Sequence, residues 1–217
     1  MIPRCLAVLT AAAALLSVQQ ACSPAGSREA AGDPNKAAAP NPKPLKPGEA
    51  VPDGTLTGHD GKTFSLSSKQ PRAVLLTFIF TRCPAMEFCP RMSLKFAEMR
   101  KALDGSRWKD GMELVSVTLD PEHDTPEVLA AYARGLEARA GSWTFAACPR
   151  GVLDGLKRAF GVRAAIAGET GTIEHNLVTV LIDAQGRLRR TWEGNTWTSA
   201  EIMAELPSAA AENAPGS

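Results

Sequence analysis

The sequence has almost no excess of charge of either sign. Its 217 residues include 24 Lys and Arg and 23 Asp and Glu, which are interspersed and leave a formal charge of +1. This balance implies neither a nucleic acid nor an acidic partner. No internal repeat is found, and a chain of this length with 44% hydrophobic residues fits one globular domain with appendages.

A long apolar run is also missing. Leu6 to Val18 is apolar or small at all but two positions, which is short of the roughly 20 residues that a membrane-spanning helix needs. With Arg4 before it, this run makes residues 1–22 typical of a secretory signal. Cys22 follows Ala21, as at the sites where bacterial lipoproteins are cleaved and acylated. We therefore expect an exported, lipid-anchored protein on the periplasmic side of the membrane, with plain cleavage or an uncleaved anchor as alternatives.

Residues 23–50 contain no aromatic residue and a single leucine, against six prolines and seven alanines. Such a segment cannot bury enough apolar surface to fold. We expect a disordered tether that reaches at most roughly 90 Å when extended, which suits delivery to a membrane-bound partner. The folded domain is expected over 51–206, and a loose tail over 207–217.

Strand and helix patterns alternate from Val51 onward. The expected elements are a hairpin around the turn 58–61, a central strand over 73–80, a helix from Pro90 to Gly105, a strand over 113–119, helices over 126–136 and 152–160, a hairpin of 177–182 with 187–192, and a last helix with a Thr198/Glu201 capping box. This order predicts an α/β fold, a thioredoxin-like sandwich whose central mixed sheet is flanked by helices, with an added N-terminal β-hairpin.

Two cysteines, Cys83 and Cys89, bracket the loop between the central strand and the helix that begins at Pro90. Two sulfurs there can oxidise to a Cys83–Cys89 disulfide or, as thiolates, bind a soft metal such as Cu(I). In an exported protein an unprotected pair tends to oxidise, so a metal role requires a thiol reductant. A purely structural disulfide is the third alternative, although structural disulfides usually join segments more distant in sequence.

A proline is missing where thioredoxins in general have one, before the strand that starts near Leu177. Thioredoxins also have two residues between their cysteines, and here there are five. In the expected fold, His175 lies at the start of that hairpin strand, at the sheet end where the cysteine loop lies. Two thiolates and an imidazole then converge, and this soft ligand set suits Cu(I).

At four places the chain resembles the Sco (SenC) family of copper chaperones, which are membrane-tethered proteins with a thioredoxin fold. These places are Phe80-Thr81-Arg82-Cys83-Pro84 with Cys89-Pro90, the string Val115 to Pro126, Trp143 with Phe145, and His175 ahead of Leu181-Ile182-Asp183. The resemblance covers roughly 51–206. It implies that Cys83 and Cys89 are the sulfur ligands of copper and that His175 is the imidazole ligand. The chain departs from the family in having five residues, not three, between the cysteines, and His123 in place of Arg or Lys.

The resemblance implies a metallochaperone that passes copper to the binuclear copper site of a cytochrome oxidase subunit, or to another copper protein, once its thiols are reduced. The alternative function is a thiol–disulfide oxidoreductase that keeps partner cysteines reduced, with Cys83 attacking and Cys89 as the second catalytic thiol. A scaffold with a structural disulfide needs neither metal nor turnover.

The remaining candidates are expected to be structural. We expect a solvated surface role for His59, and for His123 a surface or capping role, with a spare ligand or a partner contact as the alternative. Asp120 and Asp124 are expected to organise the turn and helix start, although the resemblance leaves open that Asp120 faces the partner. Cys148 is expected to be a buried free thiol or a resolving thiol, and Met86 an apolar loop plug or a thioether ligand.

Overall fold

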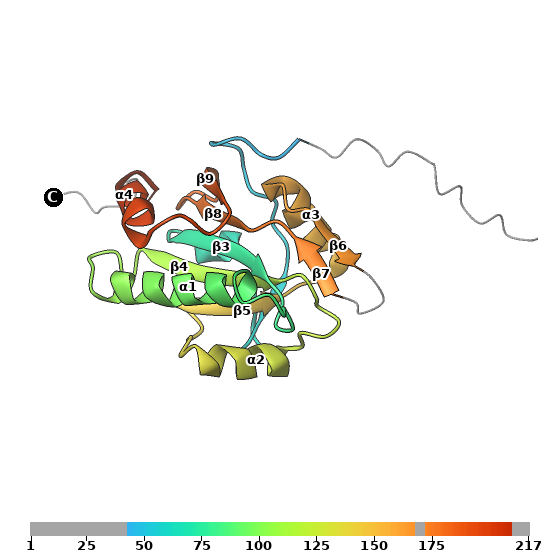
Figure 1. Ribbon diagram of the computed structural model, residues 1–217. Helices are drawn as coiled ribbons and strands as arrows, with labels where there is room; N and C mark the ends of the chain where they lie inside the picture. The colour runs from blue at the N-terminus through green and yellow to red at the C-terminus, as the bar shows by residue number, and fades with distance from the viewer. Residues whose placement is uncertain (1–42, 168–171, 210–217) are drawn as a thin grey trace, which may run out of the picture. The chain divides into compact units, whose positions relative to one another are not determined.

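A seven-stranded mixed sheet forms the centre of the domain in the computed structural model, which describes residues 43–167 and 172–209 (Figure 1). The strand order is β2-β1-β5-β4-β3-β8-β9, and a separate two-stranded sheet pairs β6 with β7. β3 is parallel to β4 and antiparallel to β8. The main sheet consists of β1 (Leu56–Gly58), β2 (Thr63–Phe64), β3 (Ala73–Ile79), β4 (Met112–Thr118), β5 (Trp143–Ala147), β8 (Val178–Ile182) and β9 (Leu188–Glu193), and the small sheet of β6 (Ala164–Ala167) and β7 (Thr172–His175).

Helices pack against both faces of this sheet. They are α1 (Cys89–Asp104), α2 (Pro126–Gly135), α3 (Arg150–Phe160) and α4 (Ser199–Ala209), with a short 3₁₀ helix at Ser67–Lys69. Buried residues of α1, α2 and α4 belong to one core cluster, and those of α3 belong to the other. The mixed sheet flanked by helices and the N-terminal hairpin β1–β2 are therefore confirmed. Among the described residues, no helix has the length and apolar character that crossing a membrane requires.

The central strand β3 is buried along its whole length because it has a core on each side. Its alternating residues Leu75 and Ile79 pack in the cluster of α1 and α4, and Leu76 and Phe78 pack in the cluster of α3. A strand covered on both faces reads as a continuous apolar run, which is why the sequence predicts it so clearly. The cysteine loop follows directly after this fully buried strand.

Three strands were not predicted. β5 is a buried strand between β1 and β4, and β6 with β7 forms an antiparallel hairpin outside the main sheet. His175 is the last residue of β7, so the expectation that it starts the strand of the last hairpin is wrong. That strand, β8, begins three residues later, at Val178.

The predicted boundaries of the tether and of the tail are wrong by several residues. Leu45 N donates to Ala159 O at 2.9 Å, and Val51 N donates to Gly186 O at 3.0 Å, so the last residues of the expected tether are part of the domain. At the other end, α4 continues past Pro207 to Ala209, whose side chain is buried. Pro207 lies in the last turns of α4, where its missing N–H removes a single helix bond. The predicted signal 1–22, the rest of the tether and the tail from 210 lie outside the described residues.

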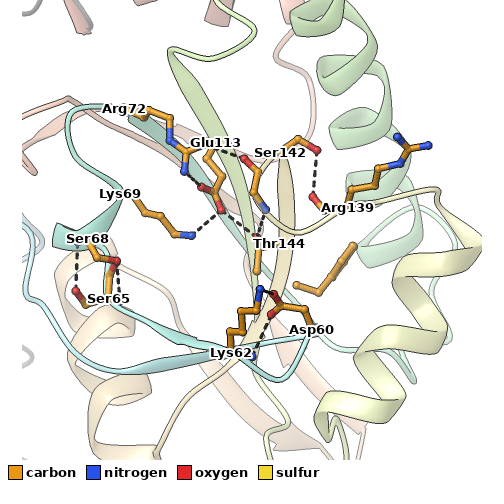
Figure 2. Close-up of polar contacts among 12 residues, drawn as sticks. Asp60, Lys62, Ser65, Ser68, Lys69, Arg72, Glu113, Arg139, Ser142 and Thr144 are labelled. Atoms are coloured by element: carbon orange, nitrogen blue, oxygen red, sulfur yellow. Dashed lines mark hydrogen bonds and ion pairs between the residues drawn. The ribbon is translucent and has the colours of Figure 1, made fainter.

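A buried charge cluster lies near the start of β4 (Figure 2). This is the sheet end opposite the cysteine loop, which follows the end of the parallel strand β3. Glu113, near the start of β4, is completely buried and accepts bonds from Lys69 Nζ at 2.8 Å and Thr144 Oγ1 at 2.9 Å. Arg72 Nη2 donates to its second oxygen at 2.5 Å. A buried carboxylate is tolerated when it is paired and hydrogen-bonded in this way. The cluster joins the segment before β3 to β4 and β5.

Candidate metal centre

The first half of the cysteine loop is fixed by two carboxylates from the segment after β4. Asp124 is completely buried and accepts from Thr81 N at 3.0 Å and from the hydroxyls of Thr81 and Thr118, both at 2.5 Å. Asp120 accepts from Arg82 Nη2 at 2.6 Å. Both aspartates are structural, as expected, but their side chains hold the two residues that precede Cys83, while the start of α2 is capped by Thr125.

The second half of the loop forms a turn against the start of α1. Phe88 N donates to Ala85 O at 3.0 Å. Asn195 Nδ2, from the segment between β9 and α4, donates to Glu87 O at 2.8 Å. Cys89 is the first residue of α1 and is fully buried, whereas Cys83 is partly exposed. The five intervening residues thus hold one thiol at the surface and one inside.

Cys89 and His175 are in contact although 86 positions separate them. The distance from Cys89 Sγ to His175 Nε2 is 3.4 Å, and that from His175 Nδ1 to the backbone oxygen of Asn176 is 2.9 Å. Because a carbonyl oxygen only accepts, Nδ1 carries the hydrogen and the lone pair of Nε2 faces the sulfur. The ring of Phe80 packs edge-on against the imidazole, with 6.0 Å between the ring centroids.

Burial keeps both groups of this pair uncharged. It raises the pKa of the Cys89 thiol well above its ordinary value, and the nearby Cys83 raises it further, although a backbone hydrogen bond with Phe80 acts in the opposite direction. Burial lowers the pKa of His175, and the bond to the Asn176 carbonyl opposes that shift. The pair is therefore a thiol beside a neutral imidazole at pH 7, and a metal that takes Cys89 as thiolate must displace its proton.

A cavity of about 420 Å³ separates the cysteine loop from β7. It is lined by Phe80, Cys83, Pro84, Ala85, Phe88, Thr172, Ile173, Glu174 and His175. Cys83 Sγ lies 3.8 Å from the carbonyl oxygen of Ala85. The structure thus brings Cys83 and His175 to one cavity and Cys89 into contact with His175.

In the two described ranges, no group of three or more His, Cys, Asp and Glu side chains is arranged so that it could hold a metal ion. The cysteines of these ranges, Cys83, Cys89 and Cys148, are free thiols. The assembled part of the predicted site is the Cys89–His175 pair.

The two other histidines have different positions. His59 is only half exposed: its Nδ1 accepts from Phe145 N at 3.0 Å and its own N donates to Phe145 O at 2.8 Å, so it fastens β1 to β5. The predicted solvated role of His59 is therefore wrong. His123 is exposed, which agrees with the surface role expected for it, and the residue that caps α2 is Thr125.

Cys148 and Met86 lie away from this pair. Cys148 is 5% exposed and belongs to the core cluster on the opposite face of the sheet from Cys89. Burial raises the pKa of the Cys148 thiol to about 11. This supports the buried free thiol over the resolving thiol. Met86 is 70% exposed and does not line the cavity, so the predicted loop plug is wrong. Cys22 lies outside the described residues.

Sequence reasoning missed Asn176 and Phe80, which orient the imidazole of His175. The sequence pattern places Phe80 in the central strand, and no residue spacing around Asn176 indicates a role at the site. Its position directly after a candidate ligand is the one sequence feature that pointed to it.

The SCO1/SenC family model matches residues 44–211. The SCO1 protein homolog of Bacillus subtilis is 31% identical over 91 residues, which are 42% of this chain and 45% of that protein. Across the first curated relatives it matches, the chain spans about half of their length.

Two solved structures share the fold. BsSco, described as a member of the Sco family of cytochrome c oxidase assembly proteins with a disulfide switch, is 24% identical with a TM-score of 0.63, covering 76% of this chain and 95% of that one. ScoI of Bradyrhizobium japonicum, solved with copper bound, is 21% identical with a TM-score of 0.62, covering 74% and 99%. These likenesses confirm the predicted thioredoxin-like sandwich. With the family model matching almost the whole described domain, the chain belongs to the SCO1/SenC family.

Proposed function

We propose that this protein is a membrane-tethered copper chaperone that holds one copper ion through Cys83, Cys89 and His175. The observation that carries the proposal is the 3.4 Å contact of Cys89 Sγ with His175 Nε2, in which the imidazole is neutral and its lone pair faces the sulfur. Two thiolates and an imidazole select Cu(I) over harder cations. The copper-bound ScoI structure of the same fold supports this choice of metal.

Copper binding needs the reduced form of the cysteine pair. The ion displaces one proton from each thiol and none from Nε2, which already offers its lone pair. Oxidation to a Cys83–Cys89 disulfide removes two electrons and two protons and takes away both sulfur ligands. A thiol reductant reverses the step, so the redox state acts as a switch; the disulfide switch described for BsSco supports this.

Transfer to an acceptor would start at Cys83. Cys83 is partly exposed and lines the cavity, whereas Cys89 is fully buried behind it. A thiolate of an acceptor protein entering this cavity would replace Cys83 first, and Cys89 and His175 would then release the ion stepwise. The acceptor is the copper-bearing subunit of a cytochrome oxidase, or another copper protein.

A competition titration tests the three-ligand site. The full chain is reduced and titrated with Cu(I) against a competing chelator, alongside Cys83→Ser, Cys89→Ser and His175→Ala. Each of the three substitutions is expected to weaken binding at least tenfold. Cys148→Ser is the matched control, because it removes a thiol on the other face of the sheet and should leave the affinity unchanged. The proposal is wrong if the wild type cannot compete, or if His175→Ala binds as tightly as the wild type.

A second candidate function is a thiol–disulfide oxidoreductase. The partly exposed Cys83 in front of the buried Cys89 favours it, because an attacking thiol must be accessible and a resolving thiol must be close behind. Cys83 would attack a partner disulfide, and Cys89 would attack the mixed disulfide to release a dithiol partner and leave the Cys83–Cys89 disulfide. Reductase activity that persists in a His175→Ala variant without copper affinity would favour this function.

The membrane tether is part of the proposal. Residues 1–22 would direct export, acylation of Cys22 would anchor the chain on the periplasmic side, and a tether that ends near Lys43 would carry the domain. Labelling with a radioactive fatty acid tests the anchor. A Cys22→Ser variant that still incorporates the label, or a wild type that does not, would contradict it.

A further inference from the structure

His175, the proposed imidazole ligand, is not part of the central sheet. His175 ends β7, which pairs with β6 in a separate two-stranded sheet, where His175 faces Ala164. The hydrogen bonds of the seven-stranded sheet therefore do not fix the distance between the imidazole and Cys89. The base of the β6–β7 hairpin has to be fixed by other contacts.

The side chain of Asn176 provides such contacts. Its Oδ1 accepts from Arg163 N at 2.7 Å, and its Nδ2 donates to Gly161 O at 3.2 Å. Its backbone N also donates to Arg163 O at 3.3 Å. Gly161 ends α3 in the left-handed conformation, with φ of 70°. One amide thus joins the end of α3, the residue before β6 and the end of β7.

The space beside this junction is open. A cavity of about 810 Å³ borders the end of α3, β6 and the Glu174–Asn176 segment. Packing from that side is therefore incomplete, and the base of the hairpin has room to shift if the amide bonds are lost. This makes the polar contacts of Asn176, more than apolar packing, responsible for the position of β7 at this point.

The backbone of the same residue sets the tautomer of the imidazole. The carbonyl oxygen of Asn176 accepts from His175 Nδ1 at 2.9 Å and leaves Nε2 free to face Cys89 Sγ. A hydrogen bond to one ring nitrogen decides which nitrogen is available to a metal. The side chain of Asn176 holds its own carbonyl in place, and that carbonyl orients the ring.

We propose that Asn176 is a positioning residue for the copper ligand His175, acting through the hairpin base and the imidazole tautomer. The proposal rests on the proposed function, in which His175 binds copper. Loss of contacts that orient a metal-binding histidine typically costs 10–100-fold in metal affinity, so Asn176→Ala should weaken Cu(I) binding by about that factor.

A double-mutant cycle separates positioning from general damage. Cu(I) affinity of the full chain is measured against a chelator for Asn176→Ala, His175→Ala and the double variant. If Asn176 acts through His175, its substitution weakens binding in the wild type and has no further effect once His175 is gone. Gln185→Ala is the matched control, since it truncates an exposed amide in the β8–β9 turn. Equal losses in both backgrounds, or no loss in the wild type, would overturn the proposal.

A second measurement needs no copper. The ¹⁵N shifts of the His175 ring in the reduced, copper-free chain should report the Nδ1–H tautomer in the wild type and Gln185→Ala, and a shift toward Nε2–H in Asn176→Ala. An unchanged tautomer would overturn the proposal, even if affinity falls. If His175→Ala retains full copper affinity, the proposed three-ligand copper site is wrong. The tautomer measurement still decides whether Asn176 positions the imidazole ring. If Asn176→Ala does not fold, both the copper titration and the ¹⁵N measurement are made on Asn176→Asp, which keeps the acceptor for Arg163 N.

Discussion

Replacement of Asp124 by alanine tests whether the fold itself holds the cysteine loop in place. The substitution removes the acceptor of three hydrogen bonds, from Thr81 N and from the hydroxyls of Thr81 and Thr118. A buried donor left unpaired costs about 1–3 kcal/mol. The two hydroxyls can rotate toward other acceptors, but the Thr81 N–H cannot. We therefore expect the free energy of unfolding to fall by about 3 kcal/mol, a large share of the roughly 5–15 kcal/mol of a typical domain.

The same change should weaken copper binding, because Thr81 lies two residues before Cys83. Urea denaturation measures the stability, and chelator competition measures the affinity. Asp124→Asn keeps the volume and separates lost hydrogen bonding from an empty cavity. Asp110→Ala, at an exposed position, should change the stability by less than about 0.5 kcal/mol. If Asp124→Ala and Asp110→Ala unfold at the same urea concentration, Asp124 does not brace the loop.

Three further predictions concern charge and thiols. Glu113→Gln should lower the free energy of unfolding, measured in urea, by about 3 kcal/mol, because it leaves Lys69 and Arg72 without their buried partner. Copper affinity should stay unchanged. A loss of copper binding would contradict the separation of the two sheet ends. The folded-state pKa of the Cys148 thiol, about 11, exceeds its ordinary value of 9.0. The stabilisation that this thiol provides is therefore present below pH 9 and is lost as the pH rises through 11. Between pH 8 and pH 11 the urea midpoint should fall less for Cys148→Ala than for the wild type. Of the three cysteines in the described residues of the reduced native protein, a maleimide should modify Cys83 first, and Cys89 and Cys148 only after unfolding, as read by mass spectrometry. Early modification of Cys89 would refute its burial.

The elements that the sequence predicted are those whose patterns are local. β3 is a continuous apolar run, the hairpin β1–β2 surrounds a glycine-rich turn, and the Thr198/Glu201 capping box forms as expected, with Thr198 N donating to Glu201 Oε2 at 2.6 Å. β5 was missed although a turn at residues 140–142 precedes it, because its burial depends on parallel pairing with β4, which lies more than 20 positions earlier in the chain. The error on His59 has the same origin, because its partner Phe145 lies on that strand.

The candidate site was predictable in its ligands but not in its supports. Cys83 and Cys89 stand out by their place between a strand and a helix, and His175 by the proline that is missing near it. The partners of Asn176 lie 13 and 15 positions earlier, and they reach it only because α3 ends at Gly161 and the chain returns through β6. Sequence spacing does not encode such a junction.

The location of His175 on the small β6–β7 sheet has a consequence for how the two sides of the site open. Cys89 is fully buried in the core cluster of α1, so its side of the site is held by the packing of that core. The β6–β7 hairpin has a single ladder and an open cavity beside it, so it can open in a local fluctuation of lower free energy. Its backbone amides should exchange with deuterium before those of β3 and β4. An ion bound between these two parts could therefore be released while the central sheet stays intact, and its release rate would follow the opening of the hairpin.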